Sequence, residues 1–263
     1  MTIRRPAVAG LALGAILLAG GCGSDDSGNS SSGTQTSAAP VATTTTAAAA
    51  GPAEELQAAY AKFADTPVKF KLTSIGGIGG TGAIDAKART SEFTTDMGSS
   101  GSMLTRQVGN DLYVKAEGQL ASAVGGAEGK WMHIDVSHVP DSSPISAKNT
   151  DPAGTAKLIT TASGLTKTGE HAFKGTVDVT KSPSMNAAAL KALGAKAKAV
   201  PFTAETDDQG NLTKFSMNLE SIAPGAGETT ATYSDWGAPV DVQAPPAAEV
   251  VDMPAKFRKA MGA

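Results

Sequence analysis

The only cysteine of the chain, Cys22, has the surroundings of a residue that is modified during export. It follows three small residues, Ala19-Gly20-Gly21, at the end of an apolar run from residue 7 to residue 18. The pair Arg4-Arg5 places positive charge before that run. This order is typical of a secretory signal peptide, and the run is shorter than a membrane-spanning helix needs to be. We therefore expect residues 1–21 to be a signal peptide.

The four residues from Ala19 to Cys22 resemble a bacterial lipobox, in which small residues fit the signal peptidase and the cysteine thiol is diacylated before cleavage. Leu18 lies one position earlier than the leucine of a lipobox, and Ala19 takes its usual place. Acylation by chains such as palmitate would anchor the mature chain, from Cys22 onward, to the extracytoplasmic face of the cell membrane. The alternative is an ordinary secretory signal with an incidental cysteine.

A glycine-rich stretch, Gly77-Ile78-Gly79-Gly80-Thr81-Gly82, has the G-x-G-x-x-G spacing of a dinucleotide-binding loop. Such a loop follows a strand and opens a helix, whose N-terminus binds pyrophosphate. Residues 83–88 instead alternate as a strand does. We therefore predict that the glycines form a hairpin turn and that the chain binds no cofactor.

No combination of side chains in the sequence matches a catalytic or metal-binding motif. Lys167-Thr168-Gly169 matches one element of penicillin-interacting enzymes, but the chain lacks the S-x-x-K motif that supplies their nucleophile. His133 and His138 lie five positions apart, which is not the spacing of a helical zinc site. We expect no catalytic residue and no metal, and we expect His133 on the strand face that also bears Trp131 and Asp135.

The composition argues against nucleic acid as a partner and favours a domain rich in strands. The formal net charge is −3, so no excess of basic residues is available for a phosphate backbone. Aromatic residues make up only 5%, whereas there are 30 glycines and 14 prolines, which suits short strands joined by turns. Because there is no second cysteine, no disulfide can form within the chain, and its stability must come from apolar burial.

The segment after the cysteine predicts a tether. Residues 23–51 consist mainly of Ser, Thr, Ala, Gly and Asp without apolar periodicity, so they cannot bury a core. A flexible coil of this length spans about 30 Å on average. We therefore expect the lipidated cysteine and its disordered tether at residues 22–51, a folded domain at residues 52–246, and a tail at residues 247–263 with an apparent short helix from residue 250.

The folded domain begins with a predicted helix and continues in strands. Pro52 suits a first helical turn, Leu56 and Tyr60 share one face, and Pro67 ends the helix. From Val68 the apolar period changes to two, which is typical of a half-buried strand. Further strands are expected at residues 82–88, 90–97, 103–108, 112–116, 131–136, 169–180, 202–206, 212–220, 229–236 and 240–242, and helices at residues 151–162 and 185–193.

This order of elements predicts an α+β fold, in which helices cover a curved antiparallel sheet that amounts to a half-open β-barrel. A sheet of this length tends to curl, and helices that fill its concave side incompletely leave a cavity lined by alternate strand positions. The same apolar positions could equally fill a solid core, because a pocket wall and a packed core have the same pattern in sequence.

The C-terminal run from Tyr233 through Trp236-Gly237 to Pro245-Pro246 combines an aromatic, a Trp-Gly pair, alternating valines and two prolines. With the strands at residues 175–178 and 112–114, it resembles the actinobacterial LppX/LprA/LprF/LprG lipoprotein family over residues 53–246. The resemblance implies an LppX/LprG-like half-open barrel, distantly similar to the LolA and LolB carriers. Family members enclose an apolar cavity for the acyl chains of envelope lipids or lipoglycans, and the resemblance implies no catalytic residue.

We therefore expect a membrane-anchored lipoprotein, not an enzyme, that binds envelope lipids or lipoglycans and carries or presents them. Its partners would be the membrane, through Cys22, and the acyl ligand. The alternative is a structural or sensory envelope lipoprotein with a filled core that binds another protein. The residues expected to line the lipid cavity are apolar and come from separate strands: Phe70, Leu72, Val114, Ile134, Val177, Phe202, Phe215 and Met217.

Overall fold

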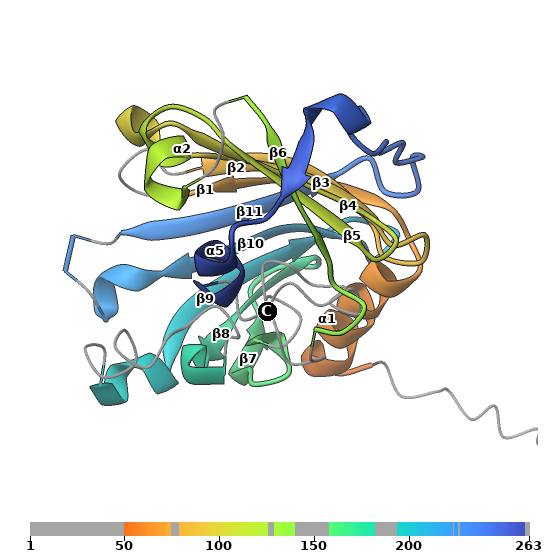
Figure 1. Ribbon diagram of the computed structural model, residues 1–263. Helices are drawn as coiled ribbons and strands as arrows, with labels where there is room; N and C mark the ends of the chain where they lie inside the picture. Colours follow the sequence, from red (N-terminus) through yellow and green to blue (C-terminus); the bar gives the residue numbers. More distant parts are fainter. Residues whose placement is uncertain are drawn as a thin grey trace, which may run out of the picture. The chain divides into compact units, whose positions relative to one another are not determined.

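The period-two segments assemble into a twelve-stranded sheet in the described part of the computed structural model (Figure 1). The structure describes residues 50–74, 79–125, 129–139, 158–181, 194–222, 224–225 and 227–260, all of which belong to the unit Ala48–Ala263. The predicted signal peptide, Cys22, nearly all of the tether, the expected helix at 185–193 and most of that at 151–162 lie outside the described residues.

The strands follow one another across the sheet in the order β12-β6-β5-β4-β3-β2-β1-β11-β10-β9-β8-β7. Their bounds are β1 Val68–Thr73, β2 Gly79–Asp85, β3 Thr90–Asp96, β4 Ser102–Val108, β5 Asp111–Ala116, β6 Trp131–Asp135, β7 Ser163–Lys167, β8 Ala172–Val177, β9 Val200–Thr206, β10 Leu212–Asn218, β11 Glu228–Ser234 and β12 Val250–Asp252. The described α-helices are α1 Pro52–Ala61, α2 Gln119–Val124 and α5 Ala255–Ala260, and the 3₁₀ turns are η1 Lys62–Ala64, η3 Gly98–Ser100, η4 Val179–Lys181, η5 Gly194–Lys198, η6 Leu219–Ser221 and η7 Ala247–Glu249.

All neighbouring strands are antiparallel except β12, which pairs in parallel with β6. Two meanders, β1 to β6 and β7 to β11, are joined through the pairing of β1 with β11, in which Lys69 lies opposite Ser234. The outermost strands, β12 and β7, do not pair with each other, so the sheet is open. The predicted fold class, an unclosed and mainly antiparallel sheet with few helices, is confirmed.

The register assigns every strand residue to one of two faces. We call the face that bears Phe70 the inner face and the opposite one the outer face. Both α1 and α5 lie on the inner face, because Leu56 of α1 and Phe257 of α5 pack among its apolar side chains. Phe63, directly after α1, also packs there and contacts Trp236 edge to face at 4.7 Å between ring centroids.

The apolar side chains of the inner face form two clusters. The first cluster joins α1 to strands β1, β2 and β8 to β11, and its fully buried members include Leu56, Phe173, Val177, Val200 and Leu212. The second cluster joins β5 and β6 to the C-terminal segment, and it consists of Leu112, Val114, Met132, Ile134, Val136 and Met253 with half-buried neighbours.

Several sequence-based expectations for single elements are wrong. Gly79 and Gly80 belong to β2 and not to a turn, whereas Gly82 lies in the strand that was expected to begin there. A Cβ on Gly80 would lie 2.7 Å from the Phe93 ring and one on Gly82 would lie 2.6 Å from the Phe70 ring, so the strand needs glycine where these rings cover it. Residues 240–242 form no strand.

The C-terminal segment also differs from its prediction. Residues 250–252 form β12 instead of the first turn of a helix, because their parallel pairing with β6 places Val251 beside Met132 on the apolar inner face. The helix α5 begins only at Ala255, after Pro254. Two further elements, α2 and β7, were not predicted from the sequence.

Candidate functional site

All eight residues predicted to line a lipid cavity lie on the inner face of the sheet. Across β2 to β5, the positions opposite one another place Phe70 in the same row as Phe93 and Val114. On the other side of β1, Leu72 shares a row with Phe215 through Ala231. The other four residues are assigned to the inner face by alternation along a strand or by pairing with an inner-face residue: Ile134 on β6, Met217 on β10, Phe202 on β9 and Val177 on β8.

The structure does not bring these eight residues into one continuous group. Val177, Phe202 and Phe215 are buried in the first cluster, and Phe70, Leu72 and Met217 are half-buried against it. Val114 and Ile134 are buried in the second cluster. Val177 has an exposed fraction of 0%, so its side chain already fills space within the protein. Whether any of the eight contacts a lipid stays a prediction.

Between the two clusters lies a strip of the inner face that we call the seam. It consists of those inner-face residues of β1 to β4 that are small, polar or half-buried: Phe70, Leu72, Gly80, Gly82, Ser91, Phe93, Thr95, Met103, Thr105 and Gln107. Val68 of β1 and Ile84 of β2 are buried in the first cluster. The rings of Phe70 and Phe93 meet here with centroids 5.3 Å apart, above the glycines of β2. The seam is thin at Gly80 and Gly82, because neither residue has a side chain.

The second cluster is covered by the C-terminal segment, residues 247–260, which we call the strap. Met253 is buried in the cluster, and its backbone N–H donates to the His133 carbonyl at 2.9 Å. At the other end of β12, the Lys130 ammonium donates to the Ala248 carbonyl at 2.8 Å. The strap is thus held by one short strand, two flanking hydrogen bonds and a few apolar side chains.

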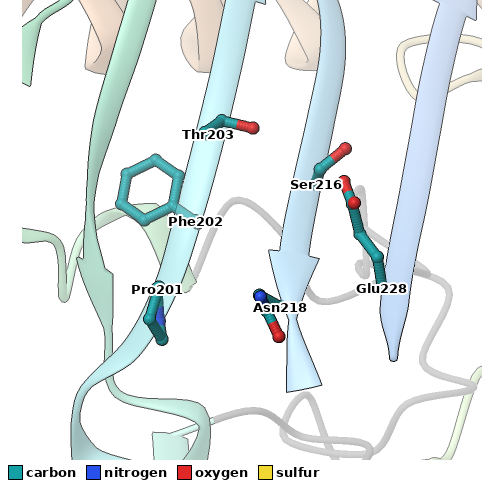
Figure 2. A pocket seen from close by; sticks show the side chains of 6 residues that line it. All are labelled: Pro201, Phe202, Thr203, Ser216, Asn218 and Glu228. Atoms are coloured by element: carbon teal, nitrogen blue, oxygen red, sulfur yellow. The ribbon is translucent and has the colours of Figure 1, made fainter. Parts of the chain in front are cut away.

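A pocket of about 240 Å³ lies on the outer face, at one end of strands β9, β10 and β11 (Figure 2). Thr203 lies opposite Ser216, and Asn218 lies opposite Glu228, so these four residues occupy adjacent outer-face positions. Pro201 precedes them on β9, and Phe202, whose ring points away from Thr203, completes the lining.

Hydrogen bonds fix the polar wall of this pocket. The buried hydroxyl of Ser216 pairs with the Thr230 hydroxyl at 2.8 Å. The Asn218 side-chain oxygen accepts from the backbone N–H of Glu220 at 3.0 Å. Glu220 in turn accepts from the N–H groups of Gly225 and Gly227, which hold the pKa of its carboxyl below the ordinary value. These bonds fix the Asn218 and Glu220 side chains at the edge of the pocket.

Glu228 is the one charged side chain among the six residues that line the pocket. The nearest basic residue on the outer face of β10, Lys214, pairs with Glu205 at 3.5 Å instead. The lining itself therefore offers acceptor oxygens and hydroxyl groups, and its one charge is negative, which disfavours an anionic ligand; the adjacent cation is Lys174, opposite Thr203 on β8.

A second set of polar side chains lies around His133. The histidine is on the outer face, where its strand position predicted it. His133 Nε2 lies 2.7 Å from an Asp111 carboxylate oxygen, and the Tyr113 ring stacks against the imidazole at 5.0 Å. Burial and the Asp111 charge raise the pKa of Tyr113. Nearby, Trp131 is buried beneath the Arg106 guanidinium, which lies 4.8 Å from its ring. Within the described ranges, no three His, Cys, Asp or Glu side chains are close enough to hold a metal ion.

Among the solved structures that resemble this chain are two of low sequence identity. Lipoprotein LppX of Mycobacterium tuberculosis is 16% identical, with a TM-score of 0.44 over 72% of this chain and 98% of its own. An uncharacterized conserved protein from Thermus thermophilus is 10% identical, with a TM-score of 0.40 over 77% of this chain and 99% of its own. No protein-family model and no curated protein sequence matches the chain. At these identities and TM-scores, neither likeness assigns a family or an activity.

In the part of the chain that the structure describes, no helix has the length and apolarity to cross a membrane.

The outer-face pocket was not predicted from the sequence. The sequence shows only that polar residues alternate along each strand, as in Thr203 and Glu205 or in Ser216 and Asn218. Which of these side chains line one pocket depends on the register of three strands.

Proposed function

We propose that the protein is a lipid-anchored envelope protein that holds the acyl chains of envelope lipids or lipoglycans on the inner face of its sheet and carries or presents them. The observation that carries the proposal is the seam. Phe70, Leu72, Phe93 and Met103 are half-buried apolar side chains on an open sheet, between two clusters that α1 and the strap cover. Partial burial leaves apolar area for a ligand to remove from water.

The energy of transfer is sufficient for such a role. Each methylene that leaves water contributes about 0.8 kcal/mol, so a long acyl chain laid along the seam can compete with its place in a bilayer. The lipobox-like sequence at Cys22 supports an anchor that keeps the domain near its lipid source, and the tether composition supports movement above the membrane.

We propose further that the protein is not an enzyme. The sequence has no G-x-S-x-G elbow and no S-x-x-K motif, and its one cysteine stands in the lipobox-like segment. A protein that binds acyl chains without catalysing a reaction needs apolar surface area and no catalytic group, and the inner face has such area.

A second candidate function has an observation in its favour. Val177, Phe202 and Phe215 have exposed fractions of 3% or less, so the larger part of the inner face is already closed by the protein's own side chains. A structural or sensory envelope protein with a filled core, which binds another protein, would need no more than this.

Lipid extraction separates the two candidates. The full chain is purified from membranes in detergent, extracted with organic solvent and analysed by mass spectrometry. Leu72→Gln places an amide at the seam and should lower the recovered lipid about tenfold, since burying an unpaired amide costs more than about 1 kcal/mol. Leu104→Gln makes the same change on the outer face of β4 and should leave recovery unchanged. Equal recovery from both variants, or none from the unmodified chain, would favour the filled core.

The anchor has its own test. Cys22→Ala should release the protein from membranes, because the remaining sequence offers no second acylation site. Membrane fractions are washed with alkaline carbonate and probed for the protein. Retention of the variant after washing would show that something other than Cys22 holds it there.

A further inference from the structure

The outer-face pocket is built from parts of three neighbouring strands, and of its lining residues Phe202 alone belongs to the first cluster. Pro201, Thr203, Asn218 and Glu228 are exposed, and they line the pocket together with buried Ser216, beside which Glu228 lies (Figure 2). The pocket lies on the face opposite the seam, so its ligand differs from the acyl chain of the proposed function.

The polar groups of the pocket match a ligand that carries several hydroxyls. The Glu228 carboxylate only accepts hydrogen bonds, whereas the hydroxyls of Thr203 and Ser216 can both donate and accept. The Ser216 hydroxyl is held in place by Thr230 at 2.8 Å, so one polar group of the site is already oriented before a ligand arrives. Neighbouring ring hydroxyls of a sugar present donors and acceptors at spacings that such a cluster can meet.

The rest of the lining sets the size and polarity of the ligand. Pro201 supplies an aliphatic ring surface beside the polar groups, which suits the C–H face of a sugar. A volume of about 240 Å³ lies below that of pockets for drug-sized ligands, so it suits one ring and not a long chain. The one charged group in the lining is the Glu228 carboxylate, which repels a phosphate or sulfate group, although Lys174 lies opposite Thr203 beside the pocket.

We propose that this pocket binds a single uncharged sugar ring of an envelope glycan. Glu228 accepts from two ring hydroxyls, Thr203 and Ser216 bond a third, and Pro201 lies against the ring. The sugar can belong to a free glycan or to the headgroup of a glycolipid, since both present the same ring. The proposal does not depend on lipid binding at the seam, and either can fail alone.

Saturation-transfer NMR tests the site with defined probes. The full chain is held in micelles of a polyoxyethylene alkyl ether, which has neither sugar nor ammonium groups. It is titrated separately with methyl α-D-mannopyranoside, with methyl β-D-glucopyranoside and, as a cation that carries no hydroxyl, with tetramethylammonium. We expect saturable transfer to at least one glycoside, with affinity in the millimolar range. Glu228→Gln and Thr203→Val should each weaken binding about tenfold, because each removes an acceptor or donor that the ring hydroxyls need.

Glu205→Gln is the matched control, because Glu205 lies on the same outer face of β9 but pairs with Lys214 outside the pocket. It should bind as the unmodified chain does. Competition by octyl β-D-glucoside added to the micelles would place the sugar on a lipid, and its absence would favour a free glycan. No saturable transfer, equal binding by Glu228→Gln and Glu205→Gln, or transfer to tetramethylammonium alone would each overturn the sugar site.

Discussion

The inner face of the sheet is closed in two different ways at its two ends. The first cluster is covered by α1 and Phe63, which directly precede β1, and the β9–β10 hairpin is tied to η1 because Lys62 donates to Asn211 at 3.0 Å and to the Gln209 carbonyl. The second cluster is covered by the strap, which returns from the end of the chain and pairs through β12 alone. The first end is a packed core, whereas the second is closed by a cover with few contacts, which we expect to separate from the sheet while the rest of the sheet stays intact.

Phe215→Ala should have the largest effect, because Phe215 lies within the packed end. Its ring has an exposed fraction of 2% and stacks on Phe202 at 5.2 Å between centroids. We expect the free energy of unfolding to fall by about 3–5 kcal/mol. Chemical denaturation followed by circular dichroism measures this change. A loss below about 1 kcal/mol would mean that the first cluster is loosely packed and that the contrast between the two ends is false.

Met253→Ala should have a smaller and more local effect. The side chain is buried at 3% exposure and fastens the strap to the second cluster. We expect a loss of about 2 kcal/mol, expressed as faster amide exchange in β12 and β6 with little change in β8 to β10. Lys256→Ala, an exposed substitution on α5, is the control and should leave exchange unchanged. Uniformly faster exchange across the sheet would show that the strap is part of one cooperative core.

Phe93→Ala compares the seam with the packed end, because it removes a phenyl ring at the seam as Phe215→Ala removes one from the first cluster. The Phe93 ring is half-buried and contacts the Phe70 ring above Gly80. Since only part of its area leaves water on folding, the free energy of unfolding should fall by about 1 kcal/mol. The same denaturation experiment measures it. A loss as large as that of Phe215→Ala would mean that the seam is core and offers no surface to a ligand.

The smallest effect concerns acid stability at the tip of the β9–β10 hairpin. Burial raises the pKa of Asp207, but hydrogen bonds from Asn211 and Gln209 and the charge of Lys62 outweigh it and hold the pKa below the ordinary 3.8. A carboxyl with a lowered pKa stabilises the folded state above its unfolded pKa, and this stabilisation is lost as the pH falls through the folded value. Melting temperatures between pH about 6 and about 2 should fall less steeply for Asp207→Asn. Parallel curves for the two proteins would contradict this assignment.

The sequence predicted those features that depend only on residues close together in the chain. Pro52 opens α1, and the alternation from Val68 identifies β1 and its inner face. The turn at Asp207 forms because its carboxylate accepts from the backbone N–H groups of Gln209 and Asn211, at 2.9 and 2.8 Å. Alternation also placed all eight expected cavity residues on one face, because a strand side chain has only two sides to choose from.

The features that the sequence did not predict depend on distant partners. Residues 250–252 form a strand because they pair with the edge of β6. No residue near position 250 indicates this pairing. Gly80 and Gly82 resemble turn residues until Phe70 and Phe93 are seen to lie over them. The outer-face pocket needs the register of three strands, and the division of the inner face into two clusters needs the positions of α1 and the strap.

The pairing of β1 with β11 has a consequence for how this chain reaches its native state. It joins residue 69 to residue 234, a separation of 165 residues, whereas every pairing from β1 to β6 is a local hairpin or a short connection. The first meander can form soon after its residues emerge, but one edge of β1 then has no partner until nearly the whole chain is available. An unpaired strand edge is a template for association with other chains. We therefore expect the pairing of β11 with β1 to be the slow step in folding, and the chain to be most exposed to aggregation before it.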